Sequence, residues 1–208
     1  MTDVKRQNKS TLRQRQAQAT RDMITSAAQA LFLEQGYACT TIEAIAAQAG
    51  VAVSTVYAVF GSKRGILRAI RQAWHEHSHI REVAFGDPGD ASPQERIRQL
   101  AQATRRQWES GAQVLAIYTG ASAADPQAAA ELAEALAGRR KGIQTFARSL
   151  EPHLRPGLDA ASAAAVLQAL CLPEVYDELV WHSGWSAEAY EAWLTQAIQR
   201  ELLPQQTG

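Results

Sequence analysis

Residues 41–60 read TIEAIAAQAGVAVSTVYAVF, and this stretch decides the fold of the N-terminal part of the chain. Ile42 and Ile45 lie at helical spacing on one side of a first short helix. Gly50 follows, and a residue without a Cβ atom readily adopts the positive φ of a tight turn. Val56 then packs a second short helix onto the first. The pattern predicts a helix-turn-helix, the motif that presents its second helix to the major groove of DNA.

The outward face of the second helix carries hydroxyl groups and small apolar groups. Since Val56 and Phe60 face the first helix, other residues of the second helix are left to point away from it. Hydroxyls bond phosphates or base edges, and small apolar groups contact thymine methyls. The residues expected on this outward face are Val53, Ser54, Thr55, Tyr57 and Ala58.

Further helices are predicted on both sides of this motif. Apolar residues recur at helical spacing over residues 24–32. Thr40-Thr41-Ile42-Glu43 fits a capping box, in which Thr40 caps the helix start and Glu43 reaches back. Another helix is expected to begin near Lys63.

The second part of the chain is also predicted to be helical. The stretch FGDPGDAS at residues 85–92 is the clearest linker. After it the pattern predicts a helix from Ser92, an alanine-rich helix opened by Asp125-Pro126, a helix over about 158–182 kinked at Pro173, and a last helix capped by Ser186. No stretch alternates as a strand does, so we expect an all-α protein of about nine helices.

Charge is distributed unevenly along the chain. The 208 residues carry 21 basic and 21 acidic side chains, and 46% hydrophobic with 20% charged residues excludes an intrinsically disordered chain. Residues 1–80 hold ten Lys and Arg against five acids, a net charge of +5, so the remainder carries −5. This asymmetry indicates that the N-terminal part meets a polyanion, the alternative being chance clustering with a solvated tail.

The N-terminal part resembles the TetR/AcrR family of bacterial transcriptional regulators over about residues 18–78. The matching positions are Phe32, Gly36-Tyr37, Thr40-Thr41, Ile45-Ala46, Ala49-Gly50-Val51, Thr55-Val56-Tyr57, Phe60 and Ser62-Lys63. The resemblance implies a basic tail (1–17), a DNA-binding domain (18–80, with the helix-turn-helix at about 41–60) and a C-terminal domain for effector binding and dimerisation (81–204).

The resemblance also implies roles for individual residues. Thr40 and Thr41 are expected to bind phosphate through backbone amides at the positive helix start. Tyr57 is expected to donate its hydroxyl to a phosphate, and Lys63 to add a point charge at the next helix start. Ser54 and Thr55 are expected nearest the bases, and Val53 is expected among the DNA-binding residues. The chain departs from the family pattern at two positions: Ala52 replaces the usual serine cap, and Val59 replaces a histidine or tyrosine.

The basic tail fits the same interpretation. Its cations are expected to cross the DNA backbone or enter the minor groove, which would steepen the salt dependence of binding. The alternative is an ordinary solvated tail. The residues concerned are Lys5, Arg6, Lys9, Arg13 and Arg15.

Two further sets of residues follow from the family architecture. The mixed polar and aromatic residues expected to line an effector pocket are Gln107, Trp108, Gln113, Tyr118 and Gln168, although a plain core role is open for the aromatic ones. The apolar residues expected at a homodimer interface are Leu167, Leu170, Leu179, Trp193, Leu194 and Ile198.

Other kinds of site find little support in the sequence. His75 and His79 share the spacing i, i+4 on one predicted helix, which suits a metal, but surface histidines are the commoner explanation and no metal or cofactor is expected. No catalytic motif occurs, so an enzyme is not expected. Cys39 and Cys171 form no disulfide framework, and no segment reads as a signal peptide or membrane span, so we expect a cytoplasmic protein without a membrane partner.

These observations combine into one functional hypothesis. We expect a homodimeric repressor that binds a palindromic operator in double-stranded DNA and is released by a small-molecule effector. The alternative is a DNA-binding regulator of the same fold without such an effector, controlled by a protein partner or by its expression.

Overall fold

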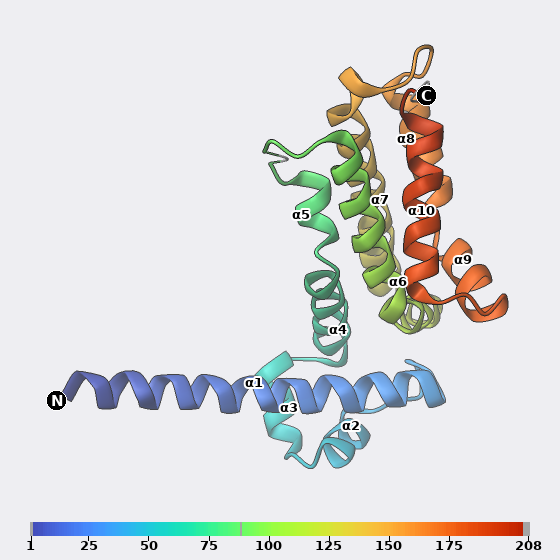
Figure 1. Cartoon of the computed structure of the whole chain (residues 1–208). Helices are drawn as coiled ribbons and strands as arrows, with labels where there is room; N and C mark the ends of the chain where they lie inside the picture. The colour runs from blue at the N-terminus through green and yellow to red at the C-terminus, as the bar shows by residue number, and fades with distance from the viewer. Residues whose placement is uncertain (1, 88, 206–208) are drawn as a thin grey trace. The chain divides into compact units, whose positions relative to one another are not determined.

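The structure is a computed structural model that describes the backbone of residues 2–87 and 89–205 and the side chains of 13–77, 79–87 and 89–205. These residues form helices and no strand (Figure 1), so the all-α prediction is confirmed. The elements are α1 (Thr2–Gln35), α2 (Ile42–Ala49), α3 (Val53–Phe60), α4 (Lys63–Ser78), α5 (Ile80–Phe85), α6 (Pro93–Ala124), α7 (Pro126–Ser149), a 3₁₀ turn η1 (Glu151–His153), α8 (Ala160–Leu170), α9 (Pro173–Tyr176), a π-helical segment η2 (Asp177–His182) and α10 (Ala187–Leu202).

The described chain forms ten α-helices, where about nine were expected, and two breaks divide stretches that were predicted as single helices. His79 has φ 54°, a left-handed conformation, and separates α4 from α5. At Pro173 the sequence predicted a kink, but α8 already ends at Leu170 and a new helix starts at the proline. Leu172 is extended, with φ −65° and ψ 146°, because a residue before proline is disfavoured in the α conformation.

The chain divides into two compact units. The first comprises Met1–Gln72 with Val114–Ala129, and the second comprises Ala73–Gln113 with Ala130–Gly208. The first therefore contains the helix-turn-helix together with the turn between α6 and α7. This division by contacts differs from the two contiguous domains expected from the sequence, and the functional boundary near residue 80 stays a prediction.

The first unit is held together by apolar side chains of α1 to α4. The stripe predicted over residues 24–32 is confirmed: Ile24, Ala28 and Phe32 are buried on one side of α1. α1 begins at Thr2, so the predicted tail is helical over residues 2–17. Arg13 and Arg15 are exposed on it, whereas the side chains of Lys5, Arg6 and Lys9 lie outside the described residues.

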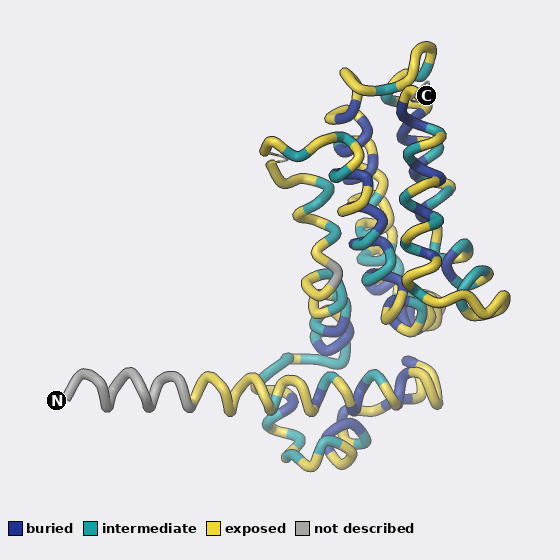
Figure 2. Tube along the Cα trace, in the orientation of Figure 1, coloured by how far each residue is buried: buried dark blue, intermediate teal, exposed yellow. Residues whose placement is uncertain are grey.

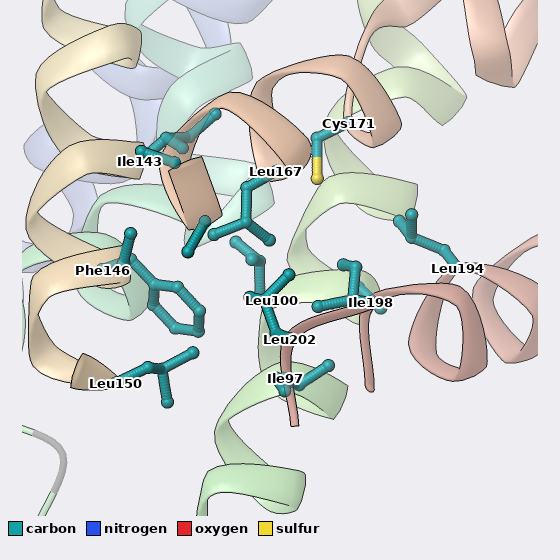
Figure 3. Close-up of a cluster of buried hydrophobic side chains, with 14 of the residues drawn as sticks. Ile97, Leu100, Ile143, Phe146, Leu150, Leu167, Cys171, Leu194, Ile198 and Leu202 are labelled. Carbon is teal, nitrogen blue, oxygen red and sulfur yellow. The ribbon is translucent and has the colours of Figure 1, made fainter. Parts of the chain in front are cut away.

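The second unit buries a continuous apolar core between α6, α7, α8 and α10. Figure 3 shows Leu100, Phe146, Leu167 and Ile198 converging from these four helices. Figure 2 shows buried residues along these same helices. Fully burying each large apolar side chain contributes about 1.5–3 kcal/mol, so this core is the main source of stability of the unit.

Among the described residues, no single helix is both long and apolar enough to cross a membrane, although α2 and α3, bent by 106°, meet these two criteria when taken together.

Candidate nucleic-acid interface

The start of α2 is capped by Thr41. Its side-chain oxygen accepts a hydrogen bond from the Ala44 amide at 3.1 Å. The predicted capping box is therefore wrong by one residue: the helix begins at Ile42, so Glu43 stands too early in it to reach back to the cap.

Thr40 lies inside the loop between α1 and α2. It is 1% exposed, and its hydroxyl donates to the Gly36 carbonyl at 2.8 Å. This hydroxyl is buried and already bonded, so it is not available to a phosphate. The phosphate contact expected from the backbone amides at this helix start stays a prediction for Thr40 and for the exposed Thr41.

The turn between α2 and α3 has the geometry predicted for it. Gly50 adopts φ 67° and ψ 30°, and its amide donates to the carbonyls of Ala46 and Ala47. The Val51 amide also donates to Ala46, at 3.0 Å. These bonds satisfy the last carbonyls of α2 and direct the chain into α3.

α3 is anchored on one side and free on the other. Val56 is fully buried, and the Arg21 guanidinium of α1 lies 4.8 Å from the centre of the Phe60 ring. Arg21 also donates to the Val59 carbonyl at 3.4 Å, so it holds the end of α3 against α1. Sequence reasoning counted Arg21 only as a charge and missed this anchoring role, for which the sequence holds no local signal.

The outward face of α3 carries the residues predicted for DNA contact. Tyr57 is 49% exposed and Ser54 is exposed, while Val53 and Thr55 are half-buried. Ala52 precedes the helix without a side-chain cap, as expected from its lack of an oxygen. The structure thus brings these four residues onto one short helix, and their roles on DNA stay predictions.

Lys63 binds protein carbonyls in this structure. Its Nζ donates to the carbonyls of Tyr37 at 2.7 Å, Thr40 at 2.8 Å and Ala38 at 3.4 Å, and it lies 4.4 Å from the centre of the Tyr37 ring. Burial lowers the pKa of Lys63. The three protons of the ammonium group are directed to these carbonyls, so Lys63 ties the start of α4 to the α1–α2 loop. Its role as a point charge toward DNA stays a prediction.

Asp125, in the turn between α6 and α7, adds a second tie to the same loop. Its Oδ2 accepts a long hydrogen bond of 3.5 Å from the Tyr37 hydroxyl and lies 3.8 Å from Nη1 of Arg64. Its Oδ1 accepts from the Gln127 amide at 2.9 Å and caps α7. The Asp125-Pro126 pair predicted the start of this helix, but nothing in the sequence indicated that Asp125 contacts Tyr37 or Arg64.

The residues predicted for an effector pocket do not form one group. Trp108 and Gln168 are brought together by Arg139, which donates to the Gln168 side chain at 3.1 Å and to the Cys171 carbonyl, the acceptor that Trp108 also uses. Gln107 is buried beside Trp108, whereas Gln113 is exposed. Tyr118 belongs to the first unit, where its hydroxyl donates to the Leu67 carbonyl, and its role in an effector pocket stays a prediction.

The residues predicted for a dimer interface separate into two sets. Leu167, Leu194 and Ile198 are fully buried inside their own protomer, so they have no area to offer a partner and the prediction for them is corrected. Leu170, Leu179 and Trp193 are half-buried. Sequence periodicity identified apolar faces correctly but does not tell a protomer core from a subunit interface.

The histidine pair does not share a helix face. α4 ends at Ser78, and His79 starts the next turn and contacts Glu82 at 2.9 Å. His75 instead stacks on Trp74. The expected i, i+4 spacing on one helix is therefore wrong, and no group of three metal-ligating side chains occurs in the part of the chain with described side chains.

Comparisons with known proteins agree with this geometry. Residues 24–70 match the model of the bacterial regulatory proteins of the tetR family. The fold is similar to that of SmeT, the repressor of a multidrug efflux pump of Stenotrophomonas maltophilia, in complex with triclosan, with 21% identity, a TM-score of 0.70, and 90% of this chain and 93% of that chain covered. No curated protein sequence matches the chain.

Two other solved structures show the same fold. NalD, a repressor of a Pseudomonas aeruginosa efflux pump, is 22% identical with a TM-score of 0.60, covering 90% of this chain and 98% of that chain. A regulator from Saccharomonospora viridis in complex with choline is 22% identical with a TM-score of 0.63, covering 89% and 98%. The similarity thus extends well beyond the helix-turn-helix into the second unit.

Proposed function

We propose that this chain, which carries the helix-turn-helix of the TetR family of bacterial transcriptional regulators and has their fold, represses transcription by placing α3 in the major groove of an operator. The observation that carries the proposal is the state of α3. Its inner side is fixed by Val56 and Arg21, while Ser54 and Tyr57 are exposed on its outer side. A rigidly held helix with free hydroxyls suits a groove, because hydroxyls bond both phosphates and base edges.

A homodimer on a palindromic operator follows from the size of one site. A single eight-residue helix reads few bases, so two copies related by a two-fold axis are needed to specify an operator. Half-sites then lie about 34–36 Å apart, one turn of DNA. The half-buried Leu170, Leu179 and Trp193 of the second unit are proposed for the subunit contact.

Release by a small molecule is proposed for the second unit. The complexes of similar proteins with triclosan and choline support it. A ligand needs only to bind the state of the dimer that is incompetent for DNA better than the competent state. The ties of Lys63 and Asp125 to the α1–α2 loop are proposed to carry the change within the first unit.

Selection of DNA by the full-length protein tests this function. Random duplexes enriched over several rounds should converge on a palindrome, and the bound form should be a dimer in sedimentation. Tyr57→Phe should weaken binding to the selected site about tenfold, since one hydrogen bond to a charged phosphate is lost. Ser110→Ala, at an exposed position of α6, is the matched control. Binding that depends on salt alone, without an enriched sequence, would overturn the proposal.

A further inference from the structure

A small pocket lies within the second unit. It is formed by α5, the first turns of α6 and the last turns of α7, and its volume is about 90 Å³. Since a water molecule takes up about 30 Å³ of liquid, the pocket has room for a molecule of a few heavy atoms and is too small for a drug-sized ligand.

The side chain in this pocket that most needs a partner is Arg96. It is 8% exposed, and its guanidinium donates to the carbonyl and the hydroxyl of Ser149 and lies 5.4 Å from the centre of the Phe146 ring. Burial lowers the pKa of Arg96. Among the described side chains, no carboxylate lies within 4 Å of it.

This arrangement leaves binding capacity at Arg96. A guanidinium has five N–H donors, and the two bonds to Ser149 use two of them. A buried charge is stabilised when it is paired and hydrogen-bonded, and a carboxylate matches a guanidinium best because it accepts two bonds side by side. An oxyanion is therefore the ligand that suits Arg96, and Arg96 lines the pocket.

Two other residues of the pocket lining carry the opposite charge. Glu82 and Asp87 both line it and both are exposed. Glu82 contacts His79 through one oxygen at 2.9 Å, and Asp87 accepts a bond from the Gly89 amide through Oδ1. The other oxygen of each carboxylate has no described hydrogen bond. A purely anionic ligand would be repelled by these two groups, whereas a ligand with its own cation would be attracted.

We propose that this pocket binds a small zwitterion of the amino-acid type, whose carboxylate pairs with Arg96 and whose ammonium group meets Glu82 and Asp87. The polar Thr145, half-buried in the lining, offers a further hydrogen bond. The proposal goes beyond the DNA-binding function and does not depend on it, because all the residues concerned belong to the second unit.

Direct titration of the full-length protein tests the proposal. The probes are L-alanine and β-alanine as zwitterions, with propionate and ethylamine as the matched compounds that carry one charge each. Calorimetry or ligand-observed NMR should show at least tenfold tighter binding of one zwitterion than of either single-charge compound. Equal binding of propionate, or no saturation by any of the four probes, would overturn the proposal.

Variants test which side chain of the pocket binds each charged group of the zwitterion. Arg96→Gln should weaken zwitterion binding at least tenfold, whereas Arg98→Gln should leave it unchanged. Arg98 is the matched control because it lies on the same helix, is exposed and pairs with Glu95 at 2.6 Å. The surface variant Glu82→Gln with Asp87→Asn, which spares the core, should abolish the preference for the zwitterion over propionate. Full binding by Arg96→Gln, or a full preference in the double variant, would contradict the proposal.

The same variants separate this inference from the proposed function. The selected operator should be bound equally by the wild type, Arg96→Gln and the double variant in the absence of ligand. Zwitterion binding without operator recognition would overturn the DNA-binding proposal alone. Operator recognition without zwitterion binding would overturn the pocket alone.

Discussion

The two units of this chain differ in how they satisfy partly buried cations. In the first unit, Lys63 donates to three backbone carbonyls, and burial lowers its pKa although Cys39 and Asp125 act in the opposite direction. In the second unit, Arg96 has the two oxygens of Ser149 and no described carboxylate. Lys63 donates all three of its ammonium protons to backbone carbonyls, whereas Arg96 uses only two of its five N–H donors. The first arrangement fixes neighbouring backbone segments, and the second leaves a cation that can bind the proposed ligand.

Replacing Lys63 by methionine should have the largest effect on this contrast. The substitution leaves the partly buried carbonyls of Tyr37 and Thr40 without their donor, at about 1–3 kcal/mol for each group. We expect a loss of about 3 kcal/mol in the free energy of unfolding and loss of operator binding, measured by urea denaturation and gel shift. Lys141→Met, at an exposed position, is the control. An unchanged urea midpoint of Lys63→Met would show that the Lys63 hydrogen bonds do not stabilise the fold.

The pH dependence of stability should reveal the apolar character of the second unit. Burial raises the pKa of Cys171 from 9.0 to about 11. Above pH 9 the unfolded thiol ionises while the folded thiol stays neutral, so the unfolded state loses protons first and stability falls as the pH rises to 11. The loss is on the order of 2 kcal/mol at 1.36 kcal/mol per unit.

The control for this effect is Cys171→Ala, which should remove that part of the fall. Other groups titrate in the same range, so the difference between the wild type and the variant between pH 9 and 11 is the quantity to measure. The exposed Cys39 of the first unit is present in both proteins, so it does not contribute to this difference. Identical curves for the wild type and Cys171→Ala would contradict the expected burial.

Removing the Asp125 side chain should have a smaller effect. Asp125→Ala loses the cap of α7 and the contacts with Tyr37 and Arg64, for about 1 kcal/mol of stability. Asp125→Asn keeps an oxygen for the cap and removes the charge, so it should retain most of the stability. Comparing the operator affinities of the two variants then distinguishes the effect of losing the α7 cap from the effect of losing the contacts with Tyr37 and Arg64. If both variants were as stable as the wild type, the Asp125 side chain would not contribute to the stability of the first unit.

The smallest effect is expected at the start of α3. Ala52→Ser introduces a side-chain oxygen where the helix has no cap, and it should stabilise the protein by about 0.5–1 kcal/mol in thermal denaturation. A gain in stability without a change in operator specificity would show that Ala52 is a local weakness of the scaffold. A loss of stability would mean that a serine cannot adopt the extended geometry of Ala52.

Local patterns predicted the helices, the turn at Gly50 and the exposed face of α3, since each depends on residues a few positions apart. Tertiary contacts could not be predicted from these local patterns. The bonds of Lys63 to Tyr37 and of Arg21 to Val59 join residues 26 and 38 positions apart, and no spacing rule indicates them. For this reason the sequence placed Lys63 on DNA and did not predict its role in the fold.

The same reason explains the errors in the second unit. Leu167, Leu194 and Ile198 have the periodicity of a buried face, but that periodicity is the same whether the partner is another helix or another subunit. The pocket at Arg96 brings α5, α6 and α7 together from stretches up to 67 residues apart, Glu82 to Ser149, and an arginine in a polar sequence context gives no sign of burial. Site residues that depend on packing therefore needed the structure.

The exposed part of α1 has a consequence for proteolysis and for local unfolding. Residues 13–19 are exposed all around the helix, so this segment has no apolar face to pack and gains little beyond its own backbone bonds. Such a segment opens at a free-energy cost far below that of global unfolding. Trypsin should cut first after Arg13 and Arg15, and bound polyanion should slow that cleavage by holding the helix closed. The extent to which α1 stays helical in solution would then indicate whether the protein is bound to DNA.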